Sequence, residues 1–201
     1  MDLNFPDFKR FRSAQAAIPA PLVFEGLAQV RAYWEGLRRG GNVPARQSLD
    51  PRGLGGVLDR VFIAERIGKG LVQVRIAGSG LADFAGLDLR GLPLSCLFTT
   101  EARPALAEAL EEVCTAPAEA AIDLASDRGN NKTVARLILL PLADEDDRKL
   151  VLGAISFLGK AGRCKFQLVQ CKVMRLYPVA ALPANAADTA FGHLRLVHSK
   201  V

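Results

Sequence analysis

Two long apolar runs in the second half of the chain constrain the fold more than any other feature. From Val134 to Leu142, and again from Leu150 to Leu158, both alternating sets of residues are apolar. A strand with one face in water alternates apolar and polar residues, whereas a strand that is buried on both faces does not. The sequence therefore predicts a sheet that is covered on both sides.

The first half of the chain changes its hydrophobic period several times. Apolar residues recur every three or four positions from Phe24 to Arg39, which predicts an amphipathic helix, and Asp50-Pro51 is a good start for a short helix. A hairpin is predicted next, with strands from Val61 to Arg66 and from Leu71 to Ala77 around a glycine-containing turn.

A helical segment separates this hairpin from three further strands. Short helical turns are expected between Leu81 and Phe98, followed by a longer helix with Arg103-Pro104 in its first turn. The strands are expected at Glu119 to Ala125, Lys132 to Leu142 and Lys149 to Leu158. This order predicts an α+β fold with one five-stranded antiparallel sheet and the inserted helices on one face.

The second face of such a sheet also needs a cover. The simplest cover is the helix from Phe24 to Arg39, supplied by the same chain or by a second subunit. We expect Trp34 to anchor that helix on the sheet.

The positive charge is concentrated at the end of the chain. The formal net charge of +5 divides into −1 up to Leu158 and +6 from Gly159 onward. We therefore divide the chain into an arm at 1–22, a domain at 23–158 and a basic tail at 159–201. A neutral domain disfavours nucleic-acid binding, because phosphate contacts supply most of the non-specific affinity. The tail is either a solvated extension or a docking segment for an acidic partner, an anionic membrane surface or nucleic acid. Within it, Gly162 to Tyr177 fits a helix or an additional strand.

Few residues in the chain suggest catalysis or metal binding. Both histidines, His193 and His198, lie in the tail, and the four cysteines form no CxxC pair. No stretch is long and apolar enough to span a membrane, and the polar N-terminus does not fit a secretory signal. We expect a cytoplasmic, non-catalytic protein with reduced thiols and no metal, and the sequence identifies no cofactor.

Several short motifs occur together in the predicted domain. They are Tyr33-Trp34-Glu35, Pro44-Ala45-Arg46, Asp50-Pro51, Val61-Phe62-Ile63-Ala64-Glu65-Arg66, Val74-Arg75-Ile76-Ala77-Gly78-Ser79-Gly80-Leu81 and Gly86-Leu87-Asp88-Leu89-Arg90-Gly91. Together with the element order, they resemble a family of stand-alone PAS-domain proteins of alphaproteobacteria. Ser79 departs from the threonine that is usual there, and the tail has no counterpart in the resemblance.

The resemblance implies a ligand pocket between the sheet and the inserted helices. Phe84, Leu97 and Phe98 are expected to line it. The set Val134, Arg136, Ile138 and Leu140 would join them if it points inward. Arg136 would then face a ligand carboxylate or phosphate, unless it pairs with Asp123 or faces the cap helix. Arg75 is the other polar candidate, unless it forms a salt bridge with Glu35 or Glu65.

The same resemblance implies a role in bacterial signal transduction. The expected protein is a sensor or adaptor that binds a small ligand, a protein partner or both, and that forms a homodimer through the cap helix and the sheet. The alternative is a docking protein that acts through its basic tail. An enzyme on the same scaffold would have only Asp83, Asp88 and Asp123 as nearby acids or bases.

Overall fold

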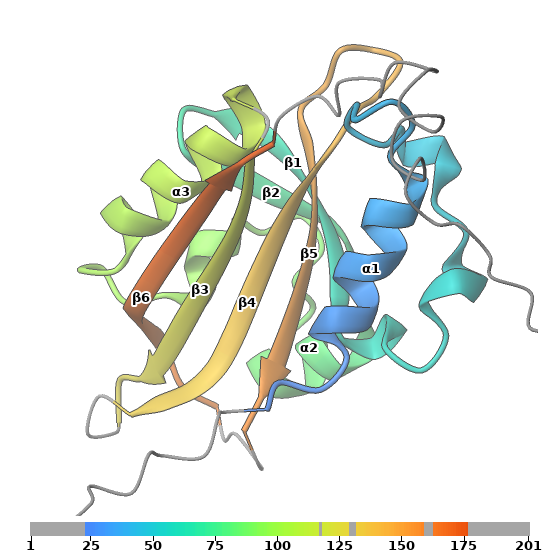
Figure 1. The fold of residues 1–201 in the computed structure, drawn as a ribbon. Helices are drawn as coiled ribbons and strands as arrows, with labels where there is room; N and C mark the ends of the chain where they lie inside the picture. The colour runs from blue at the N-terminus through green and yellow to red at the C-terminus, as the bar shows by residue number, and fades with distance from the viewer. Residues whose placement is uncertain (1–22, 117, 129–131, 159–162, 177–201) are drawn as a thin grey trace, which may run out of the picture.

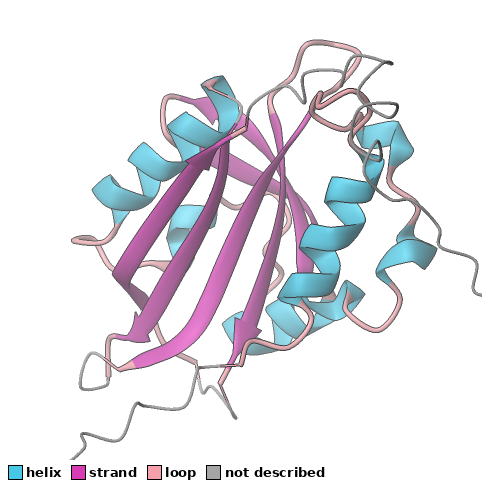
Figure 2. Ribbon diagram, viewed as in Figure 1, coloured by secondary structure: helices cyan, strands magenta, loops and turns pink. Residues whose placement is uncertain are grey.

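The computed structural model describes residues 23–116, 118–128, 132–158 and 163–176. In this part of the chain a single antiparallel sheet lies between two helical covers (Figures 1 and 2). The arm at 1–22 and most of the basic tail, with both histidines, lie outside the described residues.

Six strands form the sheet, in the spatial order β2-β1-β5-β4-β3-β6. The first five agree with the sequence prediction to within two residues at each end: β1 (Val61–Gly68), β2 (Leu71–Ala77), β3 (Ala118–Ser126), β4 (Thr133–Leu142) and β5 (Leu150–Phe157). All neighbouring strands pair antiparallel.

The prediction of five strands was wrong, because the sheet has a sixth. Strand β6 (Phe166–Arg175) pairs with β3 along its whole length, from Ser126 opposite Phe166 to Ala118 opposite Arg175. Of the two alternatives for Gly162 to Tyr177, the strand is therefore confirmed. Part of the basic segment is built into the sheet. As an edge strand, β6 can be polar on one face without losing its pairing.

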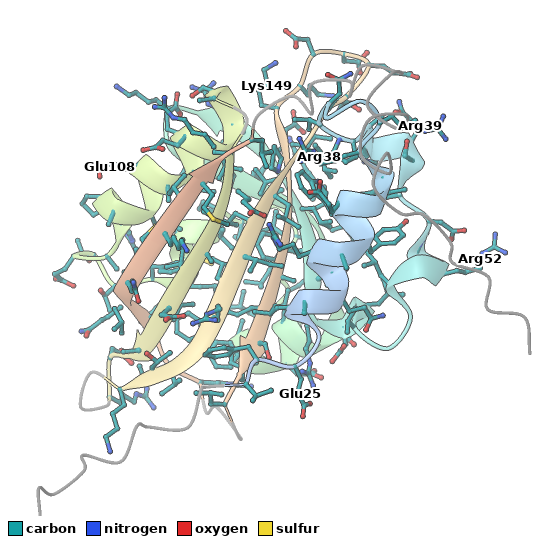
Figure 3. The ribbon with its side chains drawn as sticks, in the orientation of Figure 1. Glu25, Arg38, Arg39, Arg52, Glu108 and Lys149 are labelled. Carbon is teal, nitrogen blue, oxygen red and sulfur yellow. The ribbon has the colours of Figure 1, made fainter. Side chains whose placement is uncertain are left out.

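Three helical elements lie in the insertion between β2 and β3 and cover one face of the sheet. Helix α2 (Ser79–Ala85) and the 3₁₀ turn η4 (Leu94–Leu97) lead into α3 (Arg103–Thr115), which packs on β3, β6 and β4. Exposed side chains such as Glu108 of α3, Arg39 beyond α1 and Arg52 in η2 point away from the sheet (Figure 3). In α3 the buried residues Leu106, Ala109, Leu110 and Val113 face the core, whereas Glu108 faces water.

Helix α1 (Leu27–Leu37) lies on the opposite face, across β5 and β4 (Figure 1). Trp34 is fully buried and its Nε1 donates a hydrogen bond to the Pro141 carbonyl at 2.9 Å, so the predicted anchor is confirmed. The cover comes from the same chain. Three 3₁₀ turns, η1 (Arg46–Ser48), η2 (Pro51–Leu54) and η3 (Leu58–Arg60), connect α1 to β1, and Asp50 caps η2 as expected by accepting from Arg52 N.

The sheet separates two hydrophobic cores. Ala135, Leu137 and Leu139 of β4 belong to the core beneath the insertion, while Ile138 and Leu140 belong to the core beneath α1. The prediction that both faces of the sheet are covered is therefore confirmed for the central strands.

Candidate functional site

The core between the sheet and the insertion is almost completely filled. Its cavity has a volume of only about 10 Å³ and lies among Leu81, Leu97, Phe98 and Leu137, with other apolar residues around them. That volume is at most enough for a single water molecule. Leu97 and Phe98 thus lie where the sequence placed them, beside a cavity that holds no organic ligand in this conformation.

Aromatic rings fill the end of this core. Phe84 stacks on Phe166 with ring centroids 5.1 Å apart and lies 4.6 Å from Phe157, and Phe98 contacts Phe166 from another side at 5.9 Å. Phe166 is fully buried. The ring that completes the core therefore comes from β6, a strand that the sequence did not assign to the domain.

The inward orientation of β4, on which the ligand-binding roles of Arg136 and Ile138 depended, does not occur. Arg136, Ile138 and Leu140 face the α1 side of the sheet, whereas Ala135 and Leu137 face the insertion. Arg136 and Ile138 therefore do not line the interior cavity. The physical reason is that both alternating sets of this strand are apolar, so the hydrophobic pattern could not distinguish its two faces.

Two ion pairs cross the α1 side of the sheet. Arg136 holds Asp123 on the neighbouring strand through two bonds, at 2.5 and 3.0 Å, and its guanidinium lies 4.4 Å from the centroid of the Phe24 ring. Arg31 of α1 holds the buried Glu119 of β3 in the same way, at 2.7 and 2.6 Å. Each carboxylate raises the pKa of its arginine, mainly through these hydrogen bonds. The alternative for Arg136, pairing with Asp123, is confirmed.

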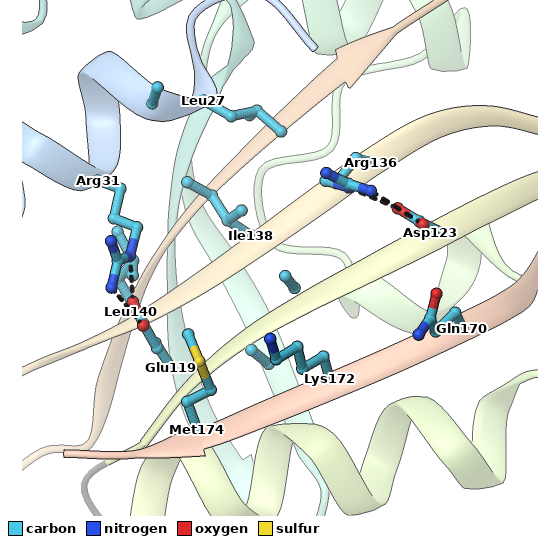
Figure 4. Close-up of a pocket in the computed structure, with 13 residues that line it drawn as sticks. Leu27, Arg31, Glu119, Asp123, Arg136, Ile138, Leu140, Gln170, Lys172 and Met174 are labelled. Atoms are coloured by element: carbon cyan, nitrogen blue, oxygen red, sulfur yellow. Dashed lines mark hydrogen bonds and ion pairs between the residues drawn. The ribbon is translucent and has the colours of Figure 1, made fainter. Parts of the chain in front are cut away.

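These residues line a groove of about 450 Å³ between α1 and β6, which we call the cap-side groove (Figure 4). Its floor is the open face of β3 and β4, with Ala121, Ile138 and Leu140. Gln170, Lys172 and Met174 of β6 form the far side. Figure 1 shows the reason for the groove: α1 covers β5 and part of β4 but leaves β3 and β6 open. The groove therefore combines an apolar floor with charged side chains of both signs.

A second groove lies on the other side of α1, over the β1–β2 hairpin. It has a volume of about 530 Å³, and Leu54, Leu58, Ile63 and Ile76 are among the apolar residues that line it. Among the described residues that line it, Arg46 is the only charged one. Helix α1 thus divides one face of the sheet into a charged groove and an apolar groove.

The remaining candidates do not form a shared site. Arg75 donates to Glu65 at 2.8 Å on the exposed side of the hairpin, which confirms that alternative, and it lines none of the three cavities above. Asp83 is exposed. Asp88 is held by Arg90, which lowers the pKa of Asp88 to about 2 and keeps it ionised at neutral pH. Asp123 is occupied by Arg136.

The described residues offer neither a metal site nor a membrane-spanning helix. They contain no group of three or more histidine, cysteine or acidic side chains arranged to hold a metal ion. Among the helices of these same residues, none has the length and hydropathy required to cross a bilayer.

Sequence reasoning missed the cap-side groove, although one signal was present. Strand β3 carries Glu119, Ala121 and Asp123 on alternate positions, which is a polar stripe beside the apolar runs of its neighbours. Such a stripe indicates a face that a helix does not fully cover.

Comparison with protein families gives a match to the PAS domain over residues 24–156. Neither the comparison with curated proteins nor that with solved structures found a match. The matched region contains α1, the hairpin, the inserted helices and strands β3 to β5 in the order described above. Because it comprises well over half of the sequence, the chain belongs to the PAS-domain family.

Proposed function

We propose that this protein is a non-catalytic bacterial signalling module that acts by protein association, with a second copy of the chain bound on the cap-side groove. Membership of the PAS family suggests a sensory or signalling role. The bacterial setting rests on the resemblance of its motifs to alphaproteobacterial PAS proteins.

The observation that carries this proposal is the contrast in free volume on the two sides of the sheet. About 10 Å³ is free beneath the insertion, against about 450 Å³ in the cap-side groove. An internal ligand would have to displace packed side chains such as Leu97 and Phe98, and well-packed cores resist this. Association at the open face needs no such rearrangement.

The chemistry of the groove supports a second copy as the occupant. A two-fold interface places the same patch on both subunits, so the patch must complement itself. The cap-side groove offers cations at Arg31, Arg136 and Lys172, carboxylates at Glu119 and Asp123, and an apolar floor between them. Because both carboxylates already accept hydrogen bonds from Arg31 and Arg136 within the chain, a second copy can bury the apolar floor without leaving either carboxylate unpaired.

The test is sedimentation velocity of the full chain over a range of concentrations, comparing the wild type with Ala121→Arg. Ala121 lies at the centre of the groove floor, opposite Lys172 on β6 and Ile138 on β4. An arginine there adds bulk and a like charge, so we expect dimer affinity to fall at least about tenfold. Ala105→Arg on the exposed surface of α3 is the matched control and is expected to leave association unchanged.

A wild type that stays monomeric at concentrations on the order of 100 µM would refute association through this face. So would equal affinities in the wild type and in Ala121→Arg. An experimental structure with an organic molecule between sheet and insertion would show that the interior, rather than the open face, receives the signal.

A further inference from the structure

We infer that the cavity between the insertion and the start of β6 is a binding site for a small organic anion, such as a phosphate monoester with an apolar body. This cavity, which we call the basic cavity, has a volume of about 320 Å³. It is separate from both grooves on the α1 side and from the proposed dimer face.

Three parts of the chain that are distant in sequence build the basic cavity. The insertion contributes Leu87, Leu92 and Cys96, the end of β3 contributes Asp127 and Arg128, and the segment before β6 contributes Arg163, Cys164 and Lys165. The cavity lies at the end of the sheet where β3 ends and β4 begins (Figure 1). The segment that leads into β6 is therefore part of the cavity wall.

Arg128 and Arg163 of the basic cavity differ from most other described arginines, which form ion pairs. Nine described arginines form ion pairs with carboxylates. Within the described part of the chain, Arg128 and Arg163 form none, although they line the same cavity. Two arginines that line one cavity, with no carboxylate partner among the described residues, leave a local positive potential that an anion can neutralise.

The one carboxylate in the lining is already engaged. Asp127 accepts a hydrogen bond from the Lys165 backbone at 3.1 Å, and the two residues also pair through Asp127 N and Lys165 O at 2.9 Å. The Lys165 side chain donates in turn to the Cys96 carbonyl. These contacts fix the walls of the cavity and leave the two arginine head groups for a ligand.

The Arg163 head group lies directly against Gly86. Gly86 ends α2 with a φ of +68°, and a Cβ atom built there would lie 2.2 Å from Arg163 Cζ. The guanidinium therefore occupies the space that any other residue would fill with its side chain. The positive φ favours glycine at this position, and a side chain there would displace the flexible Arg163 head group from its place beside the cavity.

Size and lining define the class of ligand. A volume of about 320 Å³ is at the lower end of the range for small-molecule sites, so it fits a single ring with one anionic group rather than a dinucleotide. Leu87 and Leu92 are partly exposed and offer an apolar surface for the ring. Guanidinium groups bind phosphate oxygens with paired hydrogen bonds, which makes a phosphate monoester the preferred anion.

The two thiols in the wall provide a direct readout. We would measure alkylation of each cysteine in the full chain by peptide mass spectrometry, with phenyl phosphate as the probe. Cys96 and Cys164 line the cavity, while the exposed Cys171 on β6 does not and serves as an internal reference. Phenyl phosphate at millimolar concentration is expected to slow alkylation of Cys96 and Cys164 at least about threefold without affecting Cys171, and 0.5 M salt is expected to remove most of the protection.

Substitutions separate this site from general anion binding. In Arg163→Ala and in Arg128→Ala, the phenyl phosphate concentration needed for the same protection should rise about tenfold. Each substitution removes a charged hydrogen-bond donor from the site. Arg39→Ala removes the same charge at the opposite end of the molecule (Figure 3) and is expected to change nothing. Both cavity arginines are exposed, so their replacement leaves the core intact.

Three results would overturn the inference. They are no protection of Cys96 and Cys164 by phenyl phosphate, protection that persists in both arginine variants, and equal protection by benzyl alcohol, which has the ring without the charge. Inorganic phosphate is expected to protect more weakly than phenyl phosphate, and equal protection would overturn the role of Leu87 and Leu92. The sedimentation behaviour of the chain does not enter this test, so it stands apart from the dimer proposal.

Discussion

The two faces of the same sheet differ sharply in how they are covered. Beneath the insertion, alternate residues of β3, β4 and β5 pack against α2, α3 and the aromatic ring of Phe166, and about 10 Å³ stays free. On the other face, α1 crosses only the middle of the sheet and leaves a groove on each side. The insertion side therefore supplies most of the packed core, whereas the α1 side leaves more of the sheet itself accessible.

The largest effect is expected from the residue that completes the packed face. Phe166→Ala removes a fully buried ring that contacts Phe84, Phe98 and Phe157, so we expect a loss of about 3–5 kcal/mol in the free energy of unfolding. Urea denaturation measures this. Val169→Ala, at a half-exposed position of the same strand, is the control and should cost less than about 1 kcal/mol.

If Phe166→Ala lowers the free energy of unfolding no more than Val169→Ala does, β6 is not part of the cooperatively folded unit. The packed face would then end at β3, and the contrast between the two faces would disappear.

An intermediate effect is expected from the ion pair on the α1 side. Glu119→Gln weakens two charge-assisted hydrogen bonds from Arg31 and leaves a neutral amide at a buried position. Because Arg31 is half exposed and can be solvated, we expect a loss of about 1–2 kcal/mol rather than the full cost of a buried unpaired charge. The measurement is again the urea midpoint.

Arg31→Gln is the reciprocal variant for that pair. It is expected to lose at least as much stability, because it leaves the buried Glu119 carboxylate without its partner. If neither variant changes the midpoint, the docking of α1 on β3 does not depend on this pair.

The smallest effect is expected from the ion pair at the edge of the insertion side. Glu111 of α3 accepts from Arg66 at 3.1 and 2.9 Å and from Gly70 N at 2.8 Å, and the Arg66 hydrogen bonds lower the pKa of Glu111 from its ordinary value of 4.5. A carboxylate with a lowered pKa stabilises the fold above its unfolded pKa, and this contribution is lost as the pH falls through the folded pKa. Glu111→Gln should therefore reduce stability slightly at pH 6 and make the profile between pH 5 and pH 3 flatter.

Thermal unfolding at half-unit pH intervals measures that difference. Glu108→Gln, on the exposed surface of the same helix, is the control. Parallel profiles for the wild type and Glu111→Gln would show that the folded and unfolded pKa values of Glu111 are the same, contrary to the geometry.

Local signals in the sequence were sufficient to locate most elements. The hairpin at Val61 to Ala77, the anchor Trp34 and the apolar runs of β4 and β5 depend on turn residues and hydrophobic period, which act over a few positions. The orientation of β4 could not be obtained in this way. Its two faces are both apolar, so only the packing of Ile138 and Leu140 in the core beneath α1 shows which face meets that helix.

By itself, the sequence determined that a sheet covered on both sides forms, and that a helical insertion separates its hairpin from its later strands. Those properties follow from side-chain hydrophobicity and backbone preference, which are local. Only the tertiary structure decided that β6 joins the sheet, that Phe166 fills the insertion-side core, and that Arg128 and Arg163 face one cavity. The physical reason is that an edge strand with a polar face gains its stability from the partner strand beside it, and that partner is 40 residues or more away in the chain.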